Sequence, residues 1–335
     1  MKRENLTQEN DFFGKGKISR ILFQIAPPVM LAQLIQALYN LVDSFFVGRY
    51  SANALTALSV IYPLQLIIVA LAVGTGVGLN TYMARKYAQQ EPEAADAAAG
   101  TGMVLALGTW AVFAVVSACI MEPYVRTSAT SPEAIADAIT YGRIVCIGSI
   151  GVFLEGCWTK VHQAQGNMRL PMAAQIVGAL VNLVLDPLLI FGLGPIPAMG
   201  VAGAAWATVA GQVAAAVITG WRGYRRPPQM QMAHYARRIY QLGYPSILMQ
   251  ARYTVYIVGL NVILAGFSDA AVTVLGLYYK LQTFFFIPLF GLQTCIVPVI
   301  SYNYTRAAYR RCRDTVKCSV VFRWPSWPWA RRHLS

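Results

Sequence analysis

The chain has 335 residues, of which 56% are hydrophobic and 12% charged, and its mean hydropathy is +0.48. Soluble domains carry about 25% charged residues, so the composition excludes a soluble enzyme with a single core and indicates a polytopic membrane protein. The formal net charge of +13 comes from basic residues divided among short loops. This distribution is typical of the cytoplasmic loops of a membrane protein and does not favour nucleic-acid binding.

Sequence motifs give no indication of catalysis or of a metal centre. The six cysteines contain no CxxC pair, and the three histidines lack the spacing of metal ligands. No HExxH, GxSxG or Walker A motif occurs. We therefore expect no enzymatic activity, no cofactor, no bound metal and no disulfide framework. Residues 1–17 lack the apolar region of a cleavable signal peptide, so we expect the first apolar span to serve as the insertion signal.

Eight apolar segments are long enough to cross a bilayer, which takes about 20 residues. In chain order they are predicted at 18–47, 54–83, 97–120, 135–158, 172–193, 202–221, 239–267 and 270–301. Pro27 and Pro28 are expected to bend or break the first of them near its start. Lys and Arg are concentrated in the loops on one side, which predicts a multi-pass protein of the cell membrane with a cytoplasmic N-terminus.

The sequence matches itself without gaps when it is shifted by 217 positions. Polar residues and prolines take part in this match, and they are more informative than apolar matches between membrane helices: Gln24 and Gln241, Pro28 and Pro245, Tyr39 and Tyr256, Ser51 and Ser268, Thr56 and Thr273, Gln65 and Gln282. The shift predicts an all-α fold in which a six-helix N-lobe (18–221) and a basic linker (222–238) precede the first two helices of a second, parallel repeat (239–311).

The second repeat has no further long apolar segments. Residues 312–322 resemble the opening of a ninth span, whereas residues 323–335 contain two prolines, three tryptophans and three arginines and cannot continue a membrane helix. We expect a C-terminally truncated or frame-shifted form of a longer protein. The alternative is a naturally short chain with an interfacial aromatic tail.

The first span carries a polar face made of Gln36, Tyr39, Asn40 and Asp43, spaced i, i+3, i+4 and i+7. A carboxylate inside an apolar span usually faces a cavity and serves transport or proton exchange.

A second acid, Asp186, follows Asn182 by one helical turn in the fifth span and precedes Pro187. Counted along the helices, Asp43 and Asp186 both lie about 9–12 Å below the outer surface. We predict that the two acids share a cavity. The alternative is a pair of unrelated interfacial carboxylates.

A desolvated carboxyl group holds its proton more tightly, and a second carboxylate nearby strengthens this effect. Such a pair can exchange its proton for another cation, which is the chemistry of an antiporter. Lys280 lies about 15 Å inside the eighth span, so it is expected to face the cavity or to be paired. The same expectation applies, with less support, to Arg252 in the seventh span. Glu155, with Lys160 close in sequence, is expected to be interfacial.

Several motifs together resemble the multidrug and toxic compound extrusion (MATE) transporters, in their bacterial DinF-like branch. The resemblance covers residues 10–322 and is specific only in combination. Its motifs are Tyr39-Asn40 with Asp43, Phe46-Val-Gly-Arg49, Gln163-Ala-Gln-Gly-Asn-Met-Arg-Leu-Pro-Met172, Asn182 with Asp186-Pro187, Tyr279-Lys280-Leu-Gln282, and Pro298-Val-Ile-Ser-Tyr-Asn-Tyr304.

The resemblance implies twelve helices in two six-helix lobes and export of small cationic amphipathic drugs through the lipid bilayer in exchange for H+ or Na+. It also implies that Tyr39, Asp43, Asn182 and Asp186 belong to the drug and ion pocket, with Na+ held by the last three when it is the coupling ion. No oligomer is required.

The present sequence has eight of those twelve helices, so transport by this chain alone is expected to need the missing four. Gln250 and Tyr253 lie near the place where sodium-coupled relatives carry a glutamate, which favours proton coupling. The alternatives are a flippase for lipid-linked precursors from the same superfamily and a non-functional membrane fragment.

Overall fold

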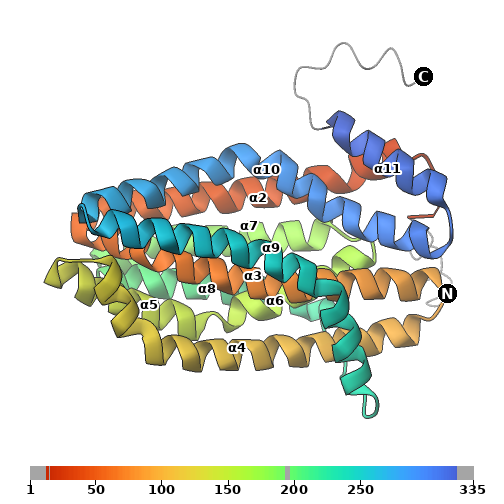
Figure 1. Ribbon diagram of the computed structural model, residues 1–335, viewed down its shortest axis with the longest axis horizontal. Helices are drawn as coiled ribbons and strands as arrows, with labels where there is room; N and C mark the ends of the chain where they lie inside the picture. Colours follow the sequence, from red (N-terminus) through yellow and green to blue (C-terminus); the bar gives the residue numbers. More distant parts are fainter. Residues whose placement is uncertain (1–12, 15, 193–196, 323–335) are drawn as a thin grey trace.

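Ten helices and no strands make up the described part of the chain, residues 13–14, 16–192 and 197–322 of the computed structural model, and they run mostly along its long axis (Figure 1). In order they are α2 (Ile18–Tyr50), α3 (Ala52–Ala88), α4 (Pro92–Ser128), α5 (Pro132–Gly148), α6 (Ile150–Ala164), α7 (Arg169–Phe191), α8 (Val201–Gly223), α9 (Met232–Ala265), α10 (Asp269–Thr305) and α11 (Tyr309–Phe322).

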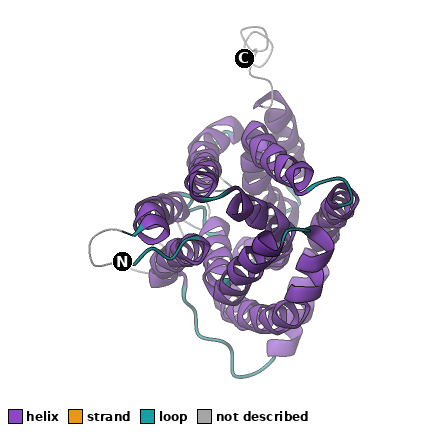
Figure 2. Cartoon of the chain, turned by 90° about the vertical axis from the view of Figure 1, so that its left-hand side faces the viewer, coloured by secondary structure: helices purple, strands orange, loops and turns teal. Residues whose placement is uncertain are grey.

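Eight helical segments of this part of the chain are long and apolar enough to cross a membrane, and all eight correspond to the predicted spans. The helices lie side by side when the molecule is viewed from one end (Figure 2). The multi-pass, all-α architecture predicted from the sequence is therefore confirmed. Pro27 and Pro28 do not divide the first span, because α2 continues through both.

The fourth span is two helices, where the sequence predicted one. α5 ends at Gly148 and α6 starts at Ile150, with Ser149 between them. The break leaves backbone carbonyls without their helical partners, and side chains replace these partners: Trp110 Nε1 donates to the Ile147 carbonyl at 2.9 Å and Ser149 Oγ to the Cys146 carbonyl at 2.7 Å. The break thus satisfies its own polar groups inside an apolar region.

The two repeats touch each other at equivalent residues. Thr56 Oγ1 on α3 and Thr273 Oγ1 on α10 are 2.9 Å apart, and the two residues are separated by 217 positions. Ser59 packs against Gly276, its counterpart at the same shift, where an added Cβ would lie 2.7 Å from Ser59 Oγ. Contacts between equivalent residues require a two-fold axis, so a pseudo-two-fold axis passes between α3 and α10.

Pairs of contacts on either side of this axis repeat in the same way. Gly74 on α3 packs against Ile247 on α9, and their counterparts Gly291 on α10 and Met30 on α2 also pack together, with an added Cβ on Gly291 lying 2.6 Å from Met30 Cγ. Small residues allow membrane helices to approach closely. Glycine at both equivalent positions therefore creates the same helix contact in both halves.

The repeat extends beyond the paired helices into α11. α3 and α10 both end in a turn with a left-handed residue, Gln90 (φ 63°) and Ala307 (φ 56°), which are 217 positions apart. The next helices, α4 and α11, begin at Pro92 and Tyr309, again with the same separation. The expected opening of a ninth span is thus the structural counterpart of the start of α4.

The basic linker is shorter than predicted. α8 ends at Gly223 and α9 begins at Met232, so the last residues assigned to the linker are helical. Arg225 within the linker pairs with Asp96 near the start of α4, with 2.9 Å between Nε and Oδ1. This ion pair attaches the linker to the end of the bundle at which α2 begins.

Candidate functional site

Two buried acids from different helices lie within electrostatic range of each other inside the first six spans. Asp43 on α2 is 4% exposed and Asp186 on α7 is fully buried. Asp43 is close enough to Asp186 to act on it electrostatically. Two carboxylates at one place cannot both be ionised without a cation between them or a shared proton, so this arrangement can hold either. We call Asp43 and Asp186 the carboxylate pair.

Asn182 fixes the Asp186 carboxylate. In the orientation that satisfies both amide atoms, the Asn182 nitrogen donates to Asp186 Oδ2 at 3.1 Å and its oxygen accepts from the Thr208 backbone N–H on α8 at 3.2 Å. Asn182 is 2% exposed. A buried amide with both ends engaged sets the orientation of its partner, so α8 holds Asp186 in place through Asn182.

Two glycines create the α7–α8 contact that makes this possible. A Cβ added to Gly178 on α7 would lie 2.7 Å from the Gly211 carbonyl oxygen on α8, and one added to Gly211 would lie 2.6 Å from the Gly178 carbonyl oxygen. The same Cβ on Gly211 would lie 3.2 Å from Asn182 Cβ. The two backbones therefore touch one turn away from Asn182, which brings its amide within reach of α8.

The polar face of α2 joins the carboxylate pair in part. Tyr39 lies close enough to Asp43 and Asp186 for both to influence it electrostatically, and Gln36 hydrogen-bonds to Tyr39. The Gln36 side chain is exposed, whereas those of Tyr39 and Asn40 are half-buried. The Asn40 carbonyl accepts a hydrogen bond from Ser44 Oγ at 2.9 Å. The predicted helix face thus changes from exposed at Gln36 to buried at Asp43.

Sequence reasoning missed three residues that complete the surroundings of the pair. Tyr141 on α5 lies within electrostatic range of Asp43 and Asp186 and interacts with the Thr208 side chain on α8. Gln65 Nε2 on α3 donates to the Tyr141 hydroxyl at 3.3 Å. A glutamine and a tyrosine inside apolar spans were the available signal, because polar side chains at that depth usually face other protein groups.

The sequence analysis also singled out three further charged residues, Lys280, Arg252 and Glu155. Lys280 belongs to α10, but its side chain lies outside the described residues. Arg252 is exposed and lines an open hollow of ≈ 580 Å³ along α9, together with Tyr244, Met249, Tyr253 and Tyr256. Glu155, which the sequence predicted to be interfacial, is half-buried, and groups from α2 and α7 as well as its own helix lie near its side chain.

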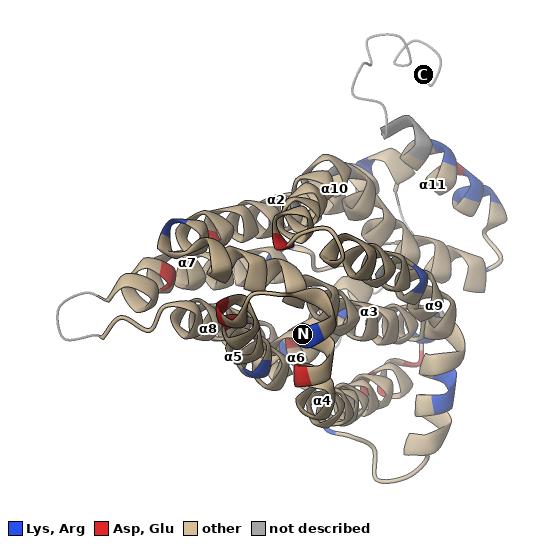
Figure 3. Ribbon diagram, turned by 60° about the vertical axis from the view of Figure 1, so that its left-hand side comes forward, with Lys and Arg blue, Asp and Glu red and all other residues tan. Residues whose placement is uncertain are grey.

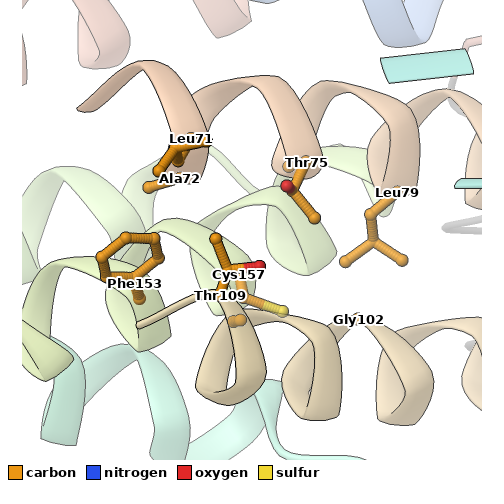
Figure 4. A pocket seen from close by; sticks show the side chains of 10 residues that line it. Leu71, Ala72, Thr75, Leu79, Gly102, Thr109, Phe153 and Cys157 are labelled. Atoms are coloured by element: carbon orange, nitrogen blue, oxygen red, sulfur yellow. The ribbon is translucent and has the colours of Figure 1, made fainter. Parts of the chain in front are cut away.

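A small cavity of ≈ 10 Å³ lies apart from the carboxylate pair, between α3, α4 and α6 (Figure 4). Its lining is largely apolar and includes Leu71, Leu79, Phe153 and Cys157, with Thr75 and Thr109 as its hydroxyl groups. This volume is about that of one water molecule. The cavity is too small for an organic ligand, so it is a packing defect and not the candidate site.

The charged side chains of the described residues are placed mainly at the ends of the bundle, and α11 in particular carries several Lys and Arg residues (Figure 3). No cluster of three or more His, Cys, Asp or Glu side chains occurs in the part of the chain that the structure describes. The buried acid pair is therefore the main electrostatic feature within the spans, and Glu155 and Lys160 on α6 are further charged residues there.

Comparisons with known proteins identify a transporter family. The sequence profile of the MatE family matches residues 28–188 and 245–323. An "FAD transporter" from Shewanella oneidensis is 24% identical over 316 residues, which are 91% of this chain and 69% of that protein. A "Probable multidrug resistance protein YoeA" from Bacillus subtilis is 25% identical over 259 residues, which are 77% of this chain and 56% of that protein.

Among solved structures, a MOP superfamily transporter from Pyrococcus furiosus superposes with a TM-score of 0.82 at 23% identity. The match covers 93% of this chain and 70% of that one. The present chain thus spans between about half and 70% of the length of these relatives. At this identity the superposition establishes the fold alone.

Proposed function

The chain belongs to the MatE family of membrane transporters, and from this premise we propose that it exports small organic cations in exchange for H+ or Na+. The observation that carries the proposal is the buried carboxylate pair, contributed by α2 and α7. An organic cation and the coupling ion would each neutralise the pair, so binding of one would displace the other. Competition for one anionic site is what couples the two fluxes in an antiporter.

We assign the site to Asp43, Asp186, Asn182 and Tyr39, with Gln36 and Asn40 on the approach to it along α2. If Na+ is the coupling ion, Asp43, Asn182 and Asp186 supply the oxygen ligands that this ion prefers; if H+ is, the two acids share it. The basic loops favour an N-terminus in the cytoplasm. The carboxylate pair would then lie in the outer half of the membrane.

The name of the Shewanella relative raises a second candidate substrate. FAD carries a diphosphate and is an anion, as are the headgroups of lipid-linked precursors. Desolvated carboxylates repel anions, so the surroundings of Asp43 and Asp186 favour cations over both alternatives. The name of the Bacillus relative, "Probable multidrug resistance protein YoeA", agrees with a cationic drug as substrate.

Binding and transport by the purified chain test the proposal. Tetraphenylphosphonium binding is measured in detergent, and ethidium efflux is measured in proteoliposomes under an imposed pH or Na+ gradient, beside a form extended to twelve helices, because transport is expected to need the missing four. Asp43→Asn and Asp186→Asn are each expected to weaken cation binding at least about tenfold, since each removes a charge-assisted contact. Glu122→Gln, on the exposed side of α4, is the control and should leave binding unchanged. Binding that survives both aspartate substitutions would refute the site.

A further inference from the structure

A further acid, Glu155 on α6, lies away from the carboxylate pair and has no part in the site assigned above. Thr159 Oγ1 donates to Glu155 Oε1 at 2.6 Å, and the Gln175 side chain on α7 interacts with the same carboxylate. The Glu155 side chain is half-buried. A carboxylate held by two neutral groups inside a membrane span still carries a charge that the surroundings do not neutralise.

Glu155 has no ion-pair partner among the described side chains. The ion pairs within 4.0 Å in that part of the chain are Lys86–Glu91, Arg126–Glu122 and Arg225–Asp96. Lys160 influences Glu155 electrostatically but is not among its direct contacts. A membrane-embedded carboxylate without a paired cation is a place where a cation can bind.

Packing against α3 explains why Lys160 forms no direct ion pair with Glu155. Its ammonium donates to Gln163 Oε1 at 2.9 Å. Its aliphatic stem lies against Gly76, where an added Cβ would be 2.7 Å from Lys160 Cγ, and Asn80 Nδ2 donates to its carbonyl at 3.2 Å. The glycine makes room for the stem, so the Lys160 side chain extends along α3 and its ammonium is satisfied by Gln163.

Tyr39 connects the two acidic sites. It lies within electrostatic range of Asp43 and Asp186 on one side and of Glu155 on the other. Glu155 is nine residues before the end of α6, or about 13 Å, while Asp43 is seven residues before the end of α2, or about 10 Å. α2 and α6 run in opposite directions through the bundle, so the two acids lie in opposite halves of the membrane with Tyr39 between them.

We propose that Glu155, held by Thr159 and Gln175, is a second cation-binding point, which receives the positive group of the transported organic cation between the carboxylate pair and the end of the bundle at which α2 begins. This inference rests on the function proposed above. Because Lys160 lies within electrostatic range, a cation is held more weakly at Glu155 than at the carboxylate pair. Because Glu155 binds the cation more weakly than the carboxylate pair does, the cation can move from Glu155 to Tyr39 and the pair.

The first test measures tetraphenylphosphonium binding to the purified full chain in detergent. Glu155→Gln is expected to weaken binding about tenfold, because it removes a charge but keeps the shape and hydrogen-bonding capacity. Glu155→Asp keeps the charge and should stay within about threefold of the unmodified chain. Glu122→Gln is the matched control. Equal binding by the Glu155→Gln variant and the unmodified chain would overturn the proposal, and so would an equal loss in Glu155→Asp.

The second test needs no substitution and therefore does not depend on whether a variant folds. Dicyclohexylcarbodiimide modifies carboxyl groups in apolar surroundings, and peptide mass spectrometry reports each acid separately. Saturating tetraphenylphosphonium should reduce modification of Glu155 severalfold while that of exposed Glu122 is unchanged. Modification of Glu155 that is the same with and without tetraphenylphosphonium would overturn the proposal.

The two proposals fail differently. If tetraphenylphosphonium protects Asp43 and Asp186 but not Glu155, the carboxylate pair is upheld and the second point is wrong. If none of the three acids is protected, the proposed function itself fails.

Discussion

The closest backbone contact of the candidate site gives the sharpest stability prediction. In Gly211→Ala the new Cβ would lie 2.6 Å from the Gly178 carbonyl oxygen, whereas ordinary contacts begin at 3.4 Å. α8 would have to move away from α7 by about 0.8 Å, because neither partner is a flexible side chain. The 3.2 Å contact between the Asn182 oxygen and the Thr208 N–H would then lengthen to about 4 Å, beyond hydrogen-bonding distance.

This rearrangement has two measurable consequences. Overpacking costs about 1–3 kcal/mol, which should lower the melting temperature by about 1–4 °C for a chain of this length. Asp186 loses the support of α8, so tetraphenylphosphonium binding should weaken as well. The control is Gly108→Ala on α4, where an added Cβ meets nothing within 4 Å and the alanine should stabilise the helix by up to about 1 kcal/mol.

The melting temperature and the binding constant are measured for both variants in the same detergent. If Gly211→Ala melts at or above the temperature of Gly108→Ala, the helices do not touch as closely as described. If it melts lower but binds tetraphenylphosphonium normally, the chain of contacts from Gly211 through Asn182 to Asp186 does not control the site.

Three further outcomes follow from other contacts. Thr56→Val and Thr273→Val should each lower the free energy of unfolding by about 1 kcal/mol. The double variant should lose little more than either single variant, because one hydrogen bond joins the two residues. Additive losses in melting temperature would contradict this. Asp269→Asn should increase hydrogen exchange at Thr130 and its neighbours, since the carboxylate accepts the Thr130 N–H at 3.1 Å; unchanged exchange would mean that this contact does not order the α4–α5 loop. Gly76→Leu should displace the Lys160 stem and change cation binding, whereas Gly259→Leu, with nothing within 4 Å, should not.

The periodicity and the internal repeat of the sequence were sufficient to predict most of the fold. Apolar segments about 20 residues long predict membrane helices, because a helix satisfies its backbone hydrogen bonds internally within the bilayer. The spans were therefore predicted correctly. The break at Ser149 was not found, because it depends on Trp110 and Ser149 itself replacing lost helical hydrogen bonds, and those contacts involve tertiary structure. The extra turns of α9 lie outside the apolar region, where hydrophobicity carries no information about helix ends.

The candidate site was predictable where one helix face supplies several polar groups. The spacing from Gln36 to Asp43 and from Asn182 to Asp186 identified both acids, and the structure brings them together. Tyr141 and Gln65 were missed because they reach the site through contacts between different helices, which helical spacing within one span does not report. The sequence placed Lys160 close to Glu155 but could not show which neighbour its ammonium contacts, and in the structure the ammonium donates to Gln163.

The repeat also shows which part of the molecule the cation site depends on. The helix contacts around the pseudo-two-fold axis are duplicated, as Gly74 with Ile247 and Gly291 with Met30 demonstrate. The chemistry is not duplicated, because the shift of 217 positions that pairs Tyr39 with Tyr256 places Leu260 opposite Asp43 and Tyr253 opposite Gln36. The packing residues serve both halves and the acids only one. The duplicated contacts therefore act as a symmetric scaffold, and the negative charge that would select a cation is confined to the first six spans.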